Sequence, residues 1–211
     1  MKNGFMVVFD GSNGAGKTTV INEVEKYLKS KGLDVILTRE PGGTPIGEKI
    51  RNIILDSSTP EMSNIAELML FGAGRAQHIQ EKIKPSLAKG KIVISDRFDA
   101  ATFSFQHYAR GIDIETITKI NDLALDGFKP DMNIILDLDP IEGLKRVKQR
   151  GEGLDRLEDE KLDFLIKARN GYLSQANEQP SMFEVIDASK TKDNVLKDVI
   201  KVIDSLIEKY H

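Results

Sequence analysis

A glycine-rich stretch near the N-terminus constrains the fold of this chain more than any other feature. Residues 9–19 read FDGSNGAGKTT, and four of them satisfy the pattern G-x-x-x-x-G-K-[ST]: Gly11, Gly16, Lys17 and Thr18. An apolar run at residues 5–9 precedes the stretch and a helical pattern follows it, which is the context that this motif requires. The sequence therefore predicts a phosphate-binding loop between a buried strand and a helix.

The chemistry of phosphate binding explains the residue types in this loop. Glycines let consecutive backbone N–H groups point at phosphate oxygens, and the following helix adds the positive end of its dipole. We expect Lys17 to reach the β- and γ-phosphates of a nucleotide and Thr18 to ligate Mg²⁺. The triphosphate of the bound nucleotide is expected to contact the whole loop: Gly11, Ser12, Asn13, Gly14, Ala15, Gly16, Lys17, Thr18 and Thr19.

Composition excludes several other classes of protein. With 211 residues the chain suits one domain, residues 1–211, with a small lid. Its 30 Lys and Arg against 33 Asp and Glu give a net charge of -3, so no basic field indicates nucleic acid or an anionic membrane as a partner. The absence of cysteine excludes disulfides, and no apolar run is long enough for a signal peptide or a membrane span. We expect a soluble, cytoplasmic protein.

Apolar runs alternate with helical patterns along the chain. The runs predict five buried strands, at residues 5–9, 35–37, 91–95, 133–138 and 183–186. Amphipathic spacing predicts helices at residues 17–31, 46–55, 64–87, 98–107, 115–125, 141–149 and 159–177, and a C-terminal helix whose apolar face holds Val195, Val199, Val202 and Leu206.

This alternation predicts an α/β fold of the P-loop NTPase type. Its three layers would be a five-stranded parallel sheet with helices on both faces. A charged, glycine-containing turn at residues 150–158 is a candidate lid. Ligands of such folds bind outside the carboxyl ends of the strands, and the phosphate loop, Arg39, Asp96 and this turn all fall on that side.

Charged residues at the strand ends indicate phosphoryl transfer. Asp96 ends the third predicted strand, and a carboxylate at this position of a P-loop enzyme approaches Mg²⁺. The adjacent Arg97 is placed to bridge two phosphates. Taken alone, Asp96 also fits a helix N-cap, and any one arginine fits a surface ion pair. Guanidinium groups nevertheless suit the spread charge of a transferring phosphoryl group. Six candidate arginines are scattered in sequence but fall mostly at strand ends or turns: Arg39, Arg51, Arg75, Arg97, Arg150 and Arg156.

Several further motifs make the chain resemble bacterial thymidylate kinases. They run in order over nearly the whole sequence: FDGSNGAGKTT at 9–19, TREPGGT at 38–44, DR at 96–97, RGI at 110–112, PD at 130–131 and RGEGLDRLE at 150–158. TREPGGT is the most specific of them, because other P-loop proteins lack it. The arginines of the candidate lid, with Gly14 rather than arginine after position 13, resemble the subclass of the family whose lid carries arginine.

The resemblance implies transfer of the γ-phosphate of ATP to dTMP, giving dTDP for the dTTP supply of DNA synthesis. It also implies Mg²⁺ as cofactor, organised by Thr18 and Asp96, and a homodimer. Arg146 would lie against adenine. The residues implied in catalysis are Lys17, Asp96, Arg97, Arg150 and Arg156.

The same resemblance implies an acceptor site. Phe71, which its apolar surroundings alone would place in the core, would stack on the thymine ring. Arg75 would contact thymine O4, and Gln106, supported by Thr102, would read the pyrimidine edge. The residues implied in dTMP binding are Asp10, Asn13, Arg39, Arg51, Phe71, Arg75, Arg97, Thr102, Phe105 and Gln106.

Several positions depart from the family pattern. Asn13 stands where relatives usually carry Asp or Glu near the acceptor sugar's 3′ hydroxyl, and Asp10 replaces the usual Glu. Phe105 lacks the phenolic hydroxyl of the usual Tyr, and Ala101 replaces Ser. A kinase shifted to dUMP or another deoxynucleoside monophosphate is therefore the alternative. A P-loop regulator without kinase activity fits less well, since the chain has neither an [NT]-K-x-D nor a D-x-x-G motif.

Overall fold

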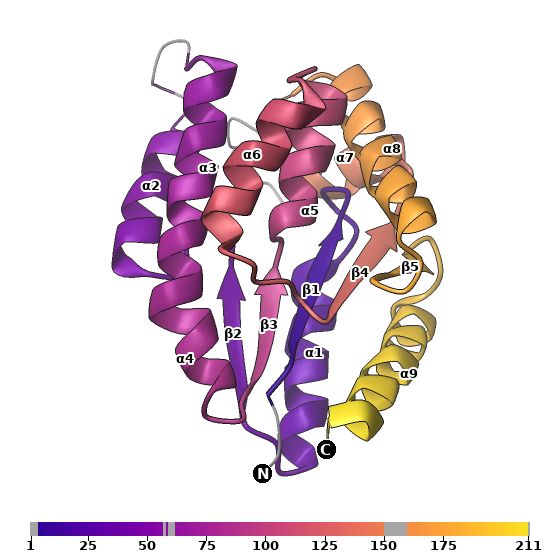
Figure 1. Cartoon of the computed structure of the whole chain (residues 1–211). Coiled ribbons are helices and arrows are strands. Elements are labelled where there is room, and N and C mark those ends of the chain that lie inside the picture. The colour runs from indigo at the N-terminus through magenta and orange to yellow at the C-terminus, as the bar shows by residue number, and fades with distance from the viewer. Residues whose placement is uncertain (1–3, 57, 59–61, 150–159, 211) are drawn as a thin grey trace.

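Five strands form a single parallel sheet in the order β2-β3-β1-β4-β5 (Figure 1). The computed structural model describes residues 4–56, 58, 62–149 and 160–210. The strands are β1 (Met6–Gly11), β2 (Val35–Arg39), β3 (Ile92–Asp96), β4 (Met132–Asp137) and β5 (Phe183–Asp187). Each lies within two residues of its predicted bounds, and the predicted parallel pairing is confirmed. The predicted lid falls outside the described residues.

Helices cover both faces of this sheet, as predicted (Figure 1). The α-helices are α1 (Lys17–Ser30), α2 (Pro45–Leu55), α3 (Asn64–His78), α4 (Lys84–Leu87), α5 (Asp99–Thr102), α6 (Ile114–Leu125), α7 (Pro140–Lys148), α8 (Leu162–Glu178) and α9 (Lys192–Tyr210). Two π-helical turns, η1 (Ile79–Ile83) and η2 (Phe103–Ala109), continue α3 and α5. The long helix predicted at 64–87 is therefore present, but η1 interrupts its α-helical geometry.

Local sequence signals set where several helices begin. Thr44 caps α2 by accepting a hydrogen bond from the Gly47 N–H, and Pro45 supplies the fixed φ favoured at the first helical position. Asp113 and Asp139 cap α6 and α7 in the same way. These caps satisfy backbone donors that have no partner inside the helix. They explain why the predicted starts of these helices are close to the observed ones.

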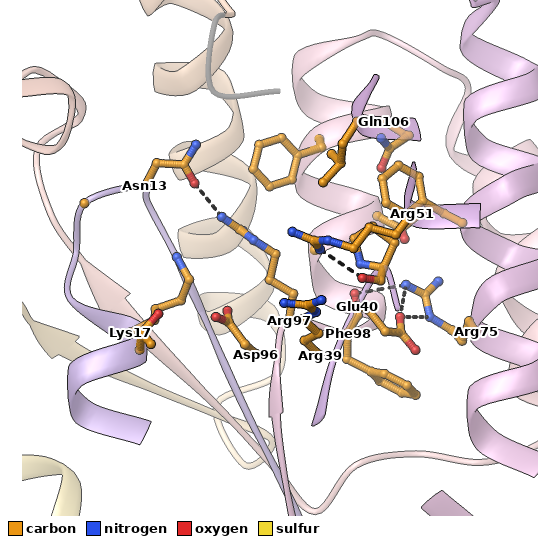
Figure 2. A pocket seen from close by; sticks show the side chains of 18 of the residues that line it. Asn13, Lys17, Arg39, Glu40, Arg51, Arg75, Asp96, Arg97, Phe98 and Gln106 are labelled. Carbon is orange, nitrogen blue, oxygen red and sulfur yellow. Dashed lines mark hydrogen bonds and ion pairs between the residues drawn. The ribbon is translucent and has the colours of Figure 1, made fainter. Parts of the chain in front are cut away.

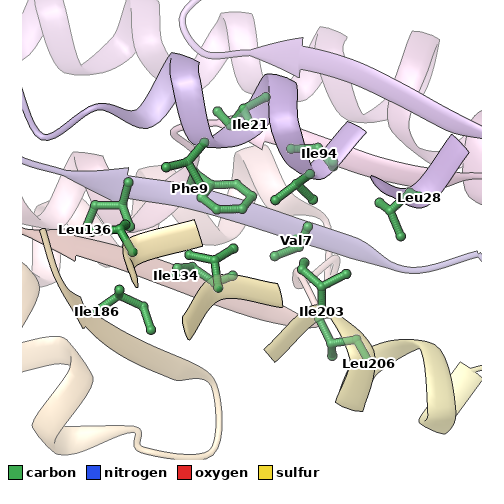
Figure 3. Packing of buried hydrophobic residues seen from close by; sticks show 14 of the residues in the cluster. Val7, Phe9, Ile21, Leu28, Ile94, Ile134, Leu136, Ile186, Ile203 and Leu206 are labelled. Carbon is green, nitrogen blue, oxygen red and sulfur yellow. The ribbon is translucent and has the colours of Figure 1, made fainter. Parts of the chain in front are cut away.

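Strand β1 is buried on both sides, and its side chains alternate between two cores. Val7 and Phe9 pack toward α1 and α9 (Figure 3), whereas Met6 and Val8 pack toward η1. On α9 the prediction is right for Val195, Val199 and Leu206 but wrong for Val202, which is only partly buried. Ile203, fully buried, takes the inward position instead.

The register of the sheet aligns the residues that precede the site. Asp96 lies opposite Phe9 on β1 and opposite Arg39 on β2. Since all three strands run parallel, the chain segments that follow them leave the sheet at one edge. That edge carries the phosphate loop, the 38–44 segment and Arg97. No helix among the described residues is both long and apolar enough to cross a bilayer.

Candidate active site

A pocket of about 300 Å³ opens at the carboxyl edge of the sheet (Figure 2). Its wall is drawn from the phosphate loop, the end of β2, α2, α3, the end of β3, and the α5–η2 segment. It brings together most of the residues predicted from sequence: Asn13, Gly14, Gly16, Lys17, Thr18, Arg39, Arg51, Phe71, Arg75, Asp96, Arg97, Thr102, Phe105 and Gln106. The predicted meeting of distant segments at this edge is thus confirmed.

Other predicted residues lie elsewhere. Asp10 is fully buried beneath the loop. Arg146, on α7, contacts the Glu142 carboxylate and the Ala188 carbonyl, each at 3.4 Å, and is outside the pocket wall. Arg150 and Arg156 fall outside the described residues. Gly11, Ser12, Ala15 and Thr19 belong to the loop but are not part of this pocket's wall.

The phosphate loop is held in shape by close backbone approaches. Gly14 has φ +78°, and a Cβ there would lie 2.4 Å from the Gly143 carbonyl oxygen on α7. Only glycine permits both that dihedral angle and that approach. The Lys17 ammonium donates to the carbonyl oxygens of Gly11 at 3.2 Å and Ser12 at 3.1 Å, which folds its charge back over the loop. These contacts fix the conformation of the loop, and its binding of phosphate stays a prediction from the sequence.

Asp96 and Thr18 offer oxygen ligands to a metal. The Asp96 side chain lines the pocket, and its buried Oδ1 has no hydrogen-bond partner in the described part of the chain. An unpaired buried carboxylate oxygen is costly unless a ligand or ion satisfies it. Mg²⁺ typically binds through one or two protein oxygens plus substrate phosphates, so these two side chains are candidate ligands for it.

Arg97 occupies the centre of the pocket in an unusual backbone conformation. Its φ of +71° is rare for a residue with a side chain. The Arg97 N–H donates to the Phe9 carbonyl at 2.9 Å, and the Ser95 hydroxyl donates to the Arg97 carbonyl at 2.7 Å. These bonds hold the strained residue, a feature that clusters at functional sites. In Figure 2, Lys17 and Asp96 lie on one side of Arg97, with Arg51, Arg75 and Gln106 on the other.

Four side chains contact the Arg97 guanidinium, and one of these contacts is an ion pair of 3.5 Å between Nη1 and Asp10 Oδ1. Nη2 donates to the Asn13 amide oxygen at 2.7 Å, and Nη1 donates to the Tyr172 hydroxyl at 2.8 Å. The guanidinium also lies over the Phe105 ring, 5.1 Å from its centroid. Asn13, the most visible departure from the family pattern, is therefore a direct partner of Arg97. Tyr172, on α8, carries no motif in the sequence, and sequence reasoning missed it.

Beneath this arginine lies a buried carboxyl. The Tyr172 hydroxyl donates to Asp10 Oδ1 at 2.8 Å, and Asp10 Oδ2 is buried with no hydrogen-bond partner among the described residues. Burial raises the pKa of Asp10 to about 7, although Arg97, Tyr172 and Lys17 act in the opposite direction. Burial likewise raises the pKa of Tyr172 well above its ordinary value, so the hydroxyl keeps its proton.

On the opposite wall a buried network fixes Arg75. The Arg75 Nε donates to Glu40 Oε2 at 3.0 Å, Nη2 donates to the Phe98 carbonyl at 3.0 Å, and Nη1 donates to Asn121. Glu40 Oε1 lies 3.0 Å from Nδ1 of the fully buried His78. Arg75 is therefore oriented before any ligand enters. Sequence reasoning named Arg75 but not the Glu40 and His78 that hold it.

Phe71, Gln106, Thr102 and Arg51 make up much of the remaining wall. Phe71 is only half-buried and lines the pocket, so it is not the core residue that its apolar neighbours alone suggest. Gln106 and Thr102 come from the α5–η2 segment and are nearly inaccessible, at 1% and 2% exposure. Arg51 donates to the Pro41 carbonyl at 2.9 Å. An aromatic ring, arginines and an amide thus converge on one half of the pocket.

The two halves of the pocket match two phosphorylated substrates. One half holds the phosphate loop, Lys17 and the unsatisfied Asp96, and the other holds Phe71, Arg75 and Gln106, with Arg97 between them. The fold and this site define a P-loop nucleotide kinase. The sequence profile of the thymidylate kinase family matches residues 9–199, and the chain belongs to that family.

Individual relatives agree over nearly full length. A thymidylate kinase from a Geobacillus species is 45% identical over 201 residues, which is 95% of this chain and 96% of the relative. One from Bacillus pumilus is 40% identical over 208 residues, 98% of each protein. The crystal structure of thymidylate kinase from Ehrlichia chaffeensis superposes with a TM-score of 0.76 at 33% identity, covering 96% of this chain and 99% of that one. The predicted family and fold class are both confirmed.

Proposed function

We propose that this chain transfers the γ-phosphate of ATP to dTMP, giving dTDP. The observation that carries the proposal is the position of Arg97, between the phosphate loop and the half of the pocket that contains Phe71 and Gln106. A guanidinium there can contact both the transferred and the accepting phosphate. The relatives over the full chain, which bear the name thymidylate kinase, support dTMP over the alternative acceptors.

Catalysis by these residues is positioning and electrostatic stabilisation. Lys17 balances charge on the γ-phosphate as it leaves ADP, and Arg97 spans the gap to the acceptor phosphate, which Arg51 and Arg39 hold from the side of α2 and β2. Thr18 and Asp96 would hold Mg²⁺, which would neutralise negative charge on the phosphates when it is bound. Arg150 and Arg156 remain predictions from the resemblance. No covalent intermediate on the protein is needed.

The acceptor half suits a deoxynucleotide with a flat base. Phe71 offers a ring face for stacking and Arg75 offers fixed N–H donors. Phe105 lies beside Arg97 in the pocket wall. From the family resemblance we expect its ring to crowd a ribose 2′ hydroxyl. Asn13, bonded to Arg97, would face the acceptor sugar through its amide.

An acceptor panel tests the proposal. ADP release, measured by a coupled assay with dTMP, dUMP, dCMP, dGMP and their ribose forms, should be fastest with dTMP. Equal or faster rates with dUMP or dCMP would indicate a shifted kinase, for which Asn13, Ala101 and Phe105 are the motivation. Slow hydrolysis of ATP that no monophosphate accelerates would instead indicate the regulator and contradict the proposal.

We propose further that the protein is a homodimer. Large apolar side chains are exposed on three neighbouring helices, α2, α3 and α6, including Ile53 at 50%, Met69 at 57% and Leu123 at 83%. Large apolar side chains that are exposed on adjacent helices would be buried if a second copy of the chain covered them. Sedimentation should give twice the chain mass, and Met69→Lys with Leu123→Lys should give the monomer. The cytoplasmic location stays a prediction from the cysteine-free sequence.

A further inference from the structure

Glu67 lies behind the wall of the acceptor half and is 1% exposed. It stands four residues before Phe71 and eight before Arg75 on α3, so the three share one face of the helix. Glu67 is not itself part of the pocket wall. Its carboxylate accepts hydrogen bonds from the Gln106 amide at 3.0 Å and from Arg110 Nε at 2.7 Å and Nη2 at 3.2 Å.

The partner of Gln106 determines which way its amide points. An ionised carboxylate only accepts hydrogen bonds, and the Arg110 guanidinium keeps Glu67 in a charged pair. Gln106 must therefore turn its NH₂ group toward Glu67. Its Oε1 takes no hydrogen bond from any described residue, and Gln106 lines the pocket. The amide oxygen is left as the acceptor for a ligand.

Gln106 and Arg75 together form a donor–acceptor pattern on one wall. Arg75 supplies N–H donors in a fixed orientation, and Gln106 supplies an acceptor. A base stacked on Phe71 would meet both with its edge. A carbonyl next to a ring N–H, the imide of thymine or uracil, matches this pattern. Cytosine carries an amino group and an unprotonated ring nitrogen in these positions. Its amino donor would face the Arg75 donors, and its ring-nitrogen acceptor would face the Gln106 acceptor, so neither hydrogen bond forms.

We propose that Glu67 is a positioning residue that makes the acceptor site selective for an imide-bearing base by fixing the orientation of the Gln106 amide. The inference rests on the proposed function and adds the origin of base selectivity to it. Glu67 acts through Gln106 and contacts no substrate itself.

The test is the ratio of kcat/KM for dTMP to kcat/KM for dCMP in Glu67→Gln. A glutamine at position 67 both donates and accepts, so the Gln106 amide can turn either way. The ratio should fall about tenfold or more, because a site with unpaired buried polar groups loses its discrimination. A purely structural role would lower activity with both substrates equally and leave the ratio unchanged, which would overturn the inference.

Arg110→Lys is the matched control. It keeps a cation beside the Glu67 carboxylate, and hence the direction of the Gln106 amide, but it cannot reproduce the two guanidinium hydrogen bonds. Arg110 also pairs with Glu160 at 2.8 Å and lies over the Phe164 ring, so stability should fall while the dTMP/dCMP ratio stays near that of the unmodified protein. A ratio that falls as far as in Glu67→Gln would assign selectivity to the Arg110 hydrogen bonds and overturn the inference.

A measurement on the unmodified protein covers the case in which Glu67→Gln does not fold, as judged by circular dichroism. N3-methyl-dTMP lacks the N–H donor, so its kcat/KM should fall at least as far as that of dCMP. Undiminished activity with N3-methyl-dTMP would overturn the inference. An unmodified protein that phosphorylates none of these nucleotides would instead reject the proposed function itself.

Discussion

The Tyr172 hydroxyl accepts a 2.8 Å hydrogen bond from the Arg97 guanidinium, across 75 residues of sequence. The same hydroxyl donates to Asp10, so one buried group on α8 connects the ends of β1 and β3. The conformation of the central arginine therefore depends on a helix that follows the candidate lid in the sequence.

Tyr172→Phe should lower kcat about tenfold or more while leaving the KM for ATP near its original value. The change removes both hydrogen bonds of the hydroxyl, the one from Arg97 and the one to Asp10, and keeps the ring that packs against Phe105. The bond from the charged guanidinium alone contributes about 1.5–3 kcal/mol. Steady-state kinetics checks this. Tyr27→Phe is the control, because its hydroxyl bonds to Asp204 between α1 and α9, away from the pocket, and an unchanged kcat in Tyr172→Phe would refute the role.

Lys17→Ala and Arg97→Ala should each reduce turnover by orders of magnitude without unfolding the protein. In the proposed function both cations would face the transferring phosphate, where loss of charge raises the energy of the transition state most strongly. Rates at saturating ATP and dTMP, with thermal melting of each variant, measure the two effects separately. Lys26→Ala provides the control, since Lys26 is 70% exposed and pairs only with Glu23 among its salt bridges in the described structure. Near-normal rates in either variant would contradict the assignment.

Asp96→Asn should raise the Mg²⁺ concentration needed for half-maximal activity. The buried Oδ1 of Asp96 has no protein partner within the described ranges, and the amide weakens the ligand while keeping the shape. A Mg²⁺ titration of activity with ATP in excess measures the shift. Asp99→Asn is a comparison, because Asp99 also has an unpaired buried Oδ1 but is not in the pocket wall, and an equal shift in both would argue against a metal role for Asp96.

The stability of the protein should fall as the pH rises from about 4 to 7, through Asp10. Burial raises the pKa of folded Asp10 to about 7 from 3.8, so in this range the folded carboxyl keeps a proton that the unfolded chain has lost. Raising the pH therefore favours unfolding, by at most about 1.4 kcal/mol per pH unit for one group. The free energy of unfolding, measured with urea across this pH range, should vary less with pH in Asp10→Asn than in the unmodified protein. A parallel pH profile in the variant would disprove the contribution.

Gly14→Ala should destabilise the protein more than Gly16→Ala. Both glycines have positive φ, +78° and +91°, so both alanines incur backbone strain of about 1–2 kcal/mol. Only at position 14 would the new Cβ also collide with backbone, 2.4 Å from the Gly143 carbonyl oxygen, whereas nothing lies within 4 Å at position 16. The denaturant midpoints of the two variants give the comparison. Equal losses of stability would mean that α7 shifts away from the new Cβ without destabilising the fold, and would contradict the prediction.

Much of the fold and of the site follows from short patterns. The alternation in β1, the caps at Thr44 and Asp139, and the spacing of Gly11, Lys17 and Thr18 all act within a few residues. Because parallel strands end at one edge, the same patterns also placed Asp96 beside the phosphate loop. Sequence reasoning misplaced Val202, which lies one position from the inward face of α9.

The sequence by itself determined the phosphate loop, the parallel α/β fold and the family of this protein, since local hydrogen bonding and periodic burial are properties of neighbouring residues. Only the tertiary structure decided how Arg97 is held by Asn13 and Tyr172, how His78 and Glu40 orient Arg75, and how Glu67 directs Gln106. The physical reason is that these side chains lie 35 to 84 residues apart and meet only when strands pair and helices pack, which leaves no local pattern to find.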